Sequence, residues 1–64
     1  MTTQVLAVPI GRFRRFGAVG PAYEILDVLG ERPDGELLLR IRILETGEEA
    51  EYRLSQAKDD PEAD

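Results

Sequence analysis

Residues 36–54 decide the fold of this chain, and they read Glu36-Leu-Leu-Leu-Arg-Ile-Arg-Ile-Leu-Glu-Thr-Gly-Glu-Glu-Ala-Glu-Tyr-Arg-Leu54. Successive side chains of a β-strand point to opposite faces of the sheet. Residues 37–43 and 50–54 both place apolar side chains at every second position, with Thr46-Gly47 between the two runs. This pattern predicts an antiparallel β-hairpin.

The apolar pattern also predicts how the two arms pair. If Glu45 lies opposite Glu48, every inner pair is apolar, namely Ile43 with Ala50, Ile41 with Tyr52 and Leu39 with Leu54. A shift by one residue would put glutamates opposite the isoleucines, so it is disfavoured. On the outer face the same register pairs Arg42 with Glu51 favourably and Arg40 with Arg53 unfavourably. Both a two-residue turn and a four-residue loop over residues 45–48 keep this register.

Two further strands are predicted before the hairpin. Residues 10–16 form the first, and the turn after them is marked by the glycines and the proline of residues 17–21. Residues 22–29 fit either a strand or a short helix. The strand is favoured because the remaining segments are spaced like a meander. Residues 30–35 then form a loop with Pro-Asp-Gly turn chemistry.

The predicted fold is mainly β, a small antiparallel meander of three to four strands near residues 10–16, 22–29, 37–45 and 48–54. A small SH3-like barrel is the closed alternative. A short C-terminal helical turn is expected over residues 55–58, with Ser55 as its N-cap. The single domain would span residues 5–58, and residues 59–64 would form an acidic flexible tail. The apolar face would carry Tyr23, Ile25, Leu39, Ile41, Ile43, Tyr52 and Leu54.

Length and composition narrow the classes of function. A chain of 64 residues buries a thin core, and this one has no cysteine for a disulfide. Self-association into a homodimer is therefore expected. The absence of histidine removes the commonest metal ligand and general base. We accordingly expect that the protein binds no metal and no cofactor and is not an enzyme. No run of apolar residues is long enough for a membrane span, so a cytoplasmic location is expected.

The charge is unevenly distributed. Residues 1–23 carry three arginines and no acid, whereas residues 24–64 carry five basic and thirteen acidic side chains, for a net charge of −5. The overall acidity argues against general binding of polyanions.

Five short motifs resemble a family of short bacterial proteins catalogued as a domain of unknown function. In chain order they are Arg14-Arg-Phe-Gly17, Gly20-Pro-Ala-Tyr-Glu-Ile25, Leu44-Glu-Thr-Gly-Glu-Glu49, Glu51-Tyr-Arg-Leu54 and Asp60-Pro-Glu-Ala63. The match runs from about residue 10 to residue 63. The resemblance implies a bacterial, single-domain cytoplasmic protein, and it brings no catalytic residue and no ligand.

The sharpest local feature is the alternation of arginine and phenylalanine over residues 12–16. Arginines for phosphates and aromatic rings for bases are typical of a nucleic-acid surface. The favoured interpretation is instead an edge strand, with Phe13 or Phe16 in the core and the arginines either paired with the acidic body or keeping the edge from aggregating. The candidate binding surface comprises Arg12, Phe13, Arg14, Arg15 and Phe16, together with the two tyrosines Tyr23 and Tyr52.

Two functions remain open from the sequence. The first is a non-catalytic protein-interaction module, with a protein partner or a second copy bound through the apolar face or an exposed edge. The alternative is a small nucleic-acid-binding or regulatory protein that uses the strand Arg12–Phe16. The carboxylates near the hairpin tip lack the spacing of a calcium site and are expected to be solvated.

Overall fold

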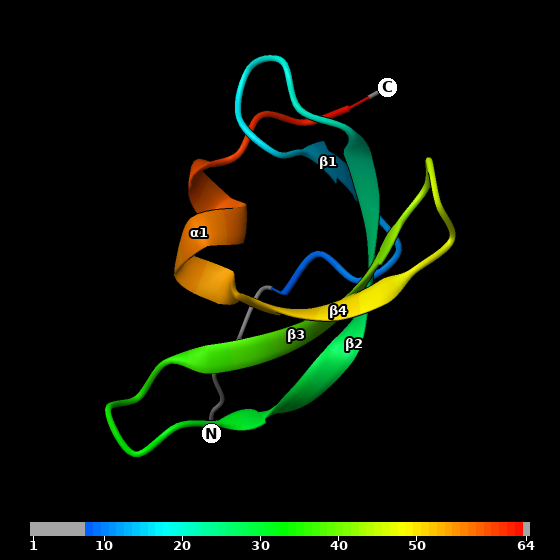
Figure 1. The fold of residues 1–64 in the computed structure, drawn as a ribbon. Helices are drawn as coiled ribbons and strands as arrows, with labels where there is room; N and C mark the ends of the chain where they lie inside the picture. Colours follow the sequence, from blue (N-terminus) through cyan, green and yellow to red (C-terminus); the bar gives the residue numbers. More distant parts are fainter. Residues whose placement is uncertain (1–7, 64) are drawn as a thin grey trace.

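The computed structural model describes residues 8–63, which form one antiparallel sheet and one short helix (Figure 1). The strands are β1 (Phe13–Arg15), β2 (Ala22–Glu31), β3 (Leu37–Ile43) and β4 (Glu49–Arg53), and α1 is Leu54–Asp59. The order in the sheet is β1-β2-β3-β4, so the predicted meander is confirmed. Since β4 does not pair with β1, the sheet is open, and the alternative of a closed barrel is wrong.

Every element differs from its predicted bounds by at least one residue; for example, β3 ends at Ile43 instead of residue 45 and β4 begins at Glu49 instead of residue 48. The segment that fitted both a helix and a strand is β2, which continues two residues further than expected. β1 is only three residues long instead of seven. Leu54, expected at the end of the last strand, is the first residue of α1. The predicted start of the domain at residues 5–7, and residue 64 of the tail, lie outside the described residues.

The hairpin has a different register from the predicted one. Ile41 lies opposite Ala50 and Leu39 opposite Tyr52, which is a shift of two residues. The shift keeps every side chain on its predicted face, and the loop spans residues 44–47 instead of the two-residue turn or the four-residue loop over residues 45–48. Gly47 ends this loop with φ of 79°, a conformation that glycine adopts without steric cost. The observed register also removes the unfavourable pairing of two arginines, because Arg40 now lies opposite Glu51.

β2 carries two irregularities that bend the sheet. The register against β3 shifts between Ile25 and Asp27, and again between Val28 and Gly30. Such bulges leave one residue unpaired and increase the local twist. The first bulge places Asp27 opposite Arg40 on the outer face. It therefore explains why Asp27 interrupts the simple alternation along this strand.

The core lies on the inner face of the bent sheet. Its fully buried side chains are Tyr23, Ile25, Leu39, Ile41 and Ala57 of α1, and Val8, Phe16, Tyr52 and Leu54 pack against them. Figure 1 shows the strands and α1 arranged around this centre. Of the predicted apolar face, Ile43, Tyr52 and Leu54 are only half-buried.

The helix is held at its start by a residue from another element. No side chain of its own caps α1, and Ser55 does not act as the N-cap. Instead the Glu36 carboxylate accepts hydrogen bonds from the Ser55 hydroxyl at 2.7 Å and from the Ser55 backbone N–H at 3.2 Å. These hydrogen bonds lower the pKa of Glu36 below its usual range. Glu36 thus ties the start of β3 to α1.

The C-terminal residues lie along β1. The sequence predicts a flexible tail from residue 59 onward, but Asp59 belongs to α1 and residues 60–63 contact the sheet. Arg15 N–H donates to the Pro61 carbonyl at 2.9 Å, and Ala63 N–H donates to the Phe13 carbonyl at 3.0 Å. These residues thus cover the edge of β1 that faces away from β2.

Candidate functional site

Three aromatic rings meet at the end of the inner face. Phe16 lies against Tyr23 with ring centroids 4.4 Å apart, and Tyr52 meets both rings edge-on at 5.3 Å and 5.2 Å. Edge-to-face and offset contacts of this kind favour aromatic packing beyond the area buried. With Asp60 these rings form what we call the tyrosine–aspartate cluster (Phe16, Tyr23, Tyr52 and Asp60).

Asp60 satisfies both tyrosine hydroxyls with a single carboxylate oxygen. The Tyr23 and Tyr52 hydroxyls each donate to Asp60 Oδ2 at 2.7 Å. Asp60 Oδ1 accepts from the Gly17 backbone N–H at 3.3 Å, and the Asp60 carbonyl accepts from the Arg14 guanidinium at 2.9 Å. The cluster thereby joins β1, β2 and β4 to the segment that follows α1.

The environment keeps both hydroxyls protonated. Burial, reinforced by the hydrogen bond to the Asp60 carboxylate, raises the pKa of Tyr52 to about 12. The same two causes, in the same order, raise the pKa of Tyr23 well above its usual range. Because a neutral hydroxyl donates to a carboxylate, the cluster is suited to holding the fold together, not to transferring protons near neutral pH.

The structure divides the predicted binding surface into two parts. Arg14 and the three aromatic residues Phe16, Tyr23 and Tyr52 gather at the tyrosine–aspartate cluster. Arg12 and Phe13 are exposed, and they line a surface hollow of about 340 Å³ with Gly11, Glu62 and Ala63. Arg15 is half-buried, and its guanidinium is 3.4 Å from the Gly20 carbonyl that accepts its hydrogen bond.

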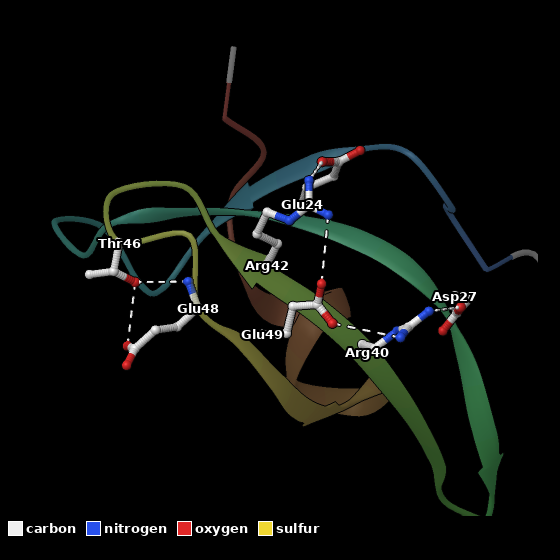
Figure 2. Close-up of polar contacts among 7 residues, drawn as sticks. All are labelled: Glu24, Asp27, Arg40, Arg42, Thr46, Glu48 and Glu49. Carbon is white, nitrogen blue, oxygen red and sulfur yellow. Dashed lines mark hydrogen bonds and ion pairs between the residues drawn. The ribbon is translucent and has the colours of Figure 1, made fainter.

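The face of the sheet that turns away from α1 carries alternating charges, which we call the outer charge ladder (Glu24, Asp27, Arg40, Arg42 and Glu49; Figure 2). Arg40 is 2.7 Å from Asp27, and both Arg40 and Arg42 lie 3.6 Å from Glu49. Arg42 also lies 3.9 Å from Glu24. These exposed pairs neutralise one another, so the two arginines are not available as a basic patch.

The hairpin tip forms a local hydrogen-bonded turn. The Thr46 hydroxyl accepts from the Glu48 N–H at 3.1 Å and donates to the Glu48 carboxylate at 3.3 Å (Figure 2). In residues 8–63 no group of three acidic side chains is arranged to hold a metal ion. The part of the chain that the structure describes also contains no helix long and apolar enough to cross a membrane.

The two edges of the sheet differ. Residues 61–63 cover the edge of β1, whereas β4 ends the sheet with no further strand beside it in the described part of the chain. Four of the five residues of β4 are exposed, and only Tyr52 is half-buried. An uncovered strand edge presents backbone N–H and C=O groups that another strand can pair with. We call this feature the open edge (Glu49–Arg53).

Another hollow lies between α1 and the loop that joins β2 to β3. Its volume is about 670 Å³, and it is lined by Glu31, Gly35, Glu36, Leu37, Leu54, Ser55, Lys58 and Asp59. The polar groups of Glu36 and Ser55 that reach it already bond to each other. Its other charged lining residues are Glu31, Lys58 and Asp59.

Comparison with known proteins places the chain in a family. The model of a family of unknown function, DUF5397, matches residues 1–64. The chain belongs to this family. It is similar to an uncharacterized protein of the bacterium Haemophilus influenzae (strain ATCC 51907 / DSM 11121 / KW20 / Rd), with 40% identity over 57 residues. This match covers 89% of the chain and 90% of the relative. The expected resemblance to a bacterial family of unknown function is thus confirmed.

Proposed function

We propose that this member of DUF5397 is a non-catalytic protein-interaction module that binds a partner strand along the open edge. The observation that carries the proposal is the contrast between the two edges of the sheet. Within residues 8–63, the chain covers β1 with residues 61–63 and places no strand beside β4. Proteins usually cover or blunt such edges, and strand addition is a recurring way of binding an extended peptide.

The neutralised outer face supports recognition through the backbone. Arg40 and Arg42 are engaged by acids of their own chain, so they offer little charge to a partner. Backbone groups at the edge of β4 can bind a strand of almost any sequence, and the exposed side chains of β4 then select among partners. We propose that this binding takes place in the cytoplasm.

The polar groups of the chain support a role without catalysis. The chain has no histidine and no cysteine. The Ser55 hydroxyl donates to Glu36, and the Thr46 hydroxyl is held within the hairpin tip. Each hydroxyl donates to a glutamate carboxylate, which is a weak general base, and the hydrogen bonds from Ser55 lower the pKa of Glu36 further.

Site-specific photocrosslinking in living cells tests the proposal. A photoreactive side chain at Ala50, which is exposed on β4, should capture one or more proteins. Glu51→Pro should abolish these products, because proline lacks the backbone N–H that a partner strand would accept from. The control is a photoreactive side chain at Val19, which is 97% exposed in the loop between β1 and β2. Identical products from position 50 with and without Glu51→Pro would contradict the proposal.

Nucleic-acid binding is the second candidate, and the observation that favours it is the hollow lined by Arg12 and the exposed Phe13. Against it, Arg14 and Arg15 donate to carbonyls of their own chain, and Phe16 packs against the core. Fluorescence anisotropy with single- and double-stranded oligonucleotides at low salt distinguishes the candidates. Binding that Arg12→Glu abolishes and that salt weakens steeply would favour this alternative.

A further inference from the structure

The backbone groups of the open edge can be assigned from the hairpin register. Ile43 N–H donates to the Glu48 carbonyl at 2.8 Å and the Ile43 carbonyl accepts from Gly47 N–H at 2.7 Å, so Ile43 and Glu48 stand at the position of a hydrogen-bonded pair. In an antiparallel ladder such pairs alternate with non-hydrogen-bonded pairs. Ala50 and Tyr52 therefore direct their N–H and C=O groups toward β3. The corresponding groups of Glu49, Glu51 and Arg53 point away from the sheet.

The charged side chains of these three residues differ in whether they form ion pairs within the described structure. Glu49 is shared between Arg40 and Arg42 in the outer charge ladder. Glu51 and Arg53 are exposed, and neither forms an ion pair within residues 8–63. They lie two positions apart on β4, so they share the outer face of the sheet. The open edge thus presents one negative and one positive side chain without partners in the described structure.

We propose that β4 pairs with β4 of a second copy of the chain, antiparallel about a two-fold axis at Tyr52. The proposal rests on the proposed function and names its partner. In this arrangement Glu51 of each copy lies opposite Arg53 of the other. Both residues have outward backbone groups, so each opposed pair can exchange two backbone hydrogen bonds. One of the two uses the second lone pair of the Arg53 carbonyl, because Arg53 is the N-cap of α1 and its carbonyl also accepts the first hydrogen bond of the helix. The two-fold axis repeats the pair, which gives four backbone hydrogen bonds and two opposite-charge pairs.

The charges select this register over its neighbours. If the two sheets join into one continuous sheet, each residue on the outer face of one copy must lie opposite a residue on the outer face of the other copy. Neighbouring registers that meet this condition differ by moving the two-fold axis one residue along β4. An axis at Glu51 places the two Glu51 side chains opposite each other, and an axis at Ala50 places Glu49 opposite Glu51. Both arrangements oppose like charges, which destabilises strand pairing. The axis at Glu51 also places Glu49 opposite Arg53, but Glu49 is already shared between Arg40 and Arg42. The axis at Tyr52 pairs Glu51 with Arg53 twice, opposes no like charges within the strand, and leaves Glu49 to Arg40 and Arg42.

The pairing is expected to be weak and reversible. It spans few residues, because α1 begins at Leu54 and ends the strand. The area that it buries falls below that of a stable interface, so the dimer should form only at high protein concentration. Sedimentation equilibrium from about 10 μM to about 1 mM at low salt covers the relevant dissociation constants.

A charge exchange tests the register. Glu51→Arg alone and Arg53→Glu alone each replace two attractive pairs with two repulsive ones, and each should raise the dissociation constant of the dimer about tenfold or more. The double variant restores opposite charges, so its dissociation constant should return to within about threefold of the original. Circular dichroism of each variant checks that the fold is intact.

Two matched variants separate this effect from general charge. Glu45→Arg makes the same change of charge in the exposed hairpin loop, outside β4, and should leave dimerisation unchanged. Glu51→Pro removes an outward N–H without removing a bond to β3, so it should weaken the dimer while the fold is retained. If the double variant dimerised no better than the single ones, the register centred on Tyr52 would be wrong.

The remaining outcomes separate this inference from the proposed function. A chain that stays monomeric at every concentration overturns self-pairing, while the crosslinking at position 50 still decides whether the open edge binds another protein. A chain that dimerises only after residues 1–7 are deleted also overturns the inference, because those residues would then be the occupant of the open edge. A dimer unaffected by Glu51→Pro and by both charge reversals would place self-association at another surface.

Discussion

At Asp60, one carboxylate oxygen accepts the hydroxyl hydrogen bonds of two tyrosines that come from different strands. Tyr23 lies 37 positions before Asp60 and Tyr52 only 8 positions before it. The contact therefore closes a long loop and a short one at the same point. A charged acceptor strengthens both hydrogen bonds relative to neutral ones.

Asp60→Ala should lower the free energy of unfolding by about 2–3 kcal/mol, because two largely buried hydroxyls lose their acceptor. Urea denaturation followed by circular dichroism measures the change. Asp59→Ala is the matched control, since Asp59 is exposed and should change stability by no more than about 0.5 kcal/mol. Equal effects of the two substitutions would show that the tyrosine–aspartate cluster contributes little to stability.

The two tyrosines should make the protein less stable in alkali. The folded state raises the pKa of Tyr52 from 10.0 to about 12 and raises that of Tyr23 as well. The unfolded chain thus loses these protons at lower pH, so the stabilisation is complete below pH 10.0 and is lost as the pH rises toward 12. Since the chain has only these two tyrosines, tyrosinate absorbance reads them directly. Titration of both near pH 10.0 in the folded protein would contradict this prediction.

Part of the cluster could be predicted from the sequence. Alternation places Tyr23 and Tyr52 on the same apolar face, and a buried tyrosine hydroxyl usually finds a hydrogen-bond partner. The sequence does not show which of thirteen acidic residues supplies that partner. Asp60 lies in a segment whose composition is typical of a solvated tail, so its role depends on how α1 turns the chain back toward β1.

Among the elements, the hairpin shows where sequence patterns stop determining structure. Alternation decides which face each residue occupies, and those faces are as predicted. A shift of two residues leaves the faces unchanged, so only the loop and the outer charges distinguish the two registers. The observed loop ends at Gly47 in a left-handed conformation, and the outer pairs then join arginines to glutamates. Both features favour the observed register, which apolar pairing alone does not select.

Gly47→Ala should therefore destabilise the hairpin by about 1–2 kcal/mol, because φ of 79° is costly for any residue with a Cβ atom. Thermal unfolding provides the measurement. Gly30→Ala is the matched control, since Gly30 has no positive φ and no atom lies within 4 Å of the added Cβ. The control should be neutral or slightly stabilising. A comparable loss of stability in both variants would argue against this loop conformation.

At the scale of the whole molecule, a short chain completes its fold by returning its C-terminus to its first strand. The segment after α1 covers β1 and brings Asp60 to the two tyrosines, so it closes one end of the core that the described residues form. The same arrangement leaves β4 as the uncovered edge of the sheet in the described structure. The proposed interaction site is thus the second edge of the sheet, β4, which the C-terminal segment does not cover.

Deleting residues 61–64 should uncover β1 while leaving Asp60 and its tyrosines in place. The loss of two backbone hydrogen bonds predicts a decrease in the free energy of unfolding of about 1–3 kcal/mol. Hydrogen exchange localises the effect. The Arg15 amide, which donates to the Pro61 carbonyl, should exchange faster, whereas the Arg14 amide faces β2 by alternation and should stay protected. If both amides lost protection equally, the C-terminal segment would be required for the whole of β1, and covering its edge would not be a separate role.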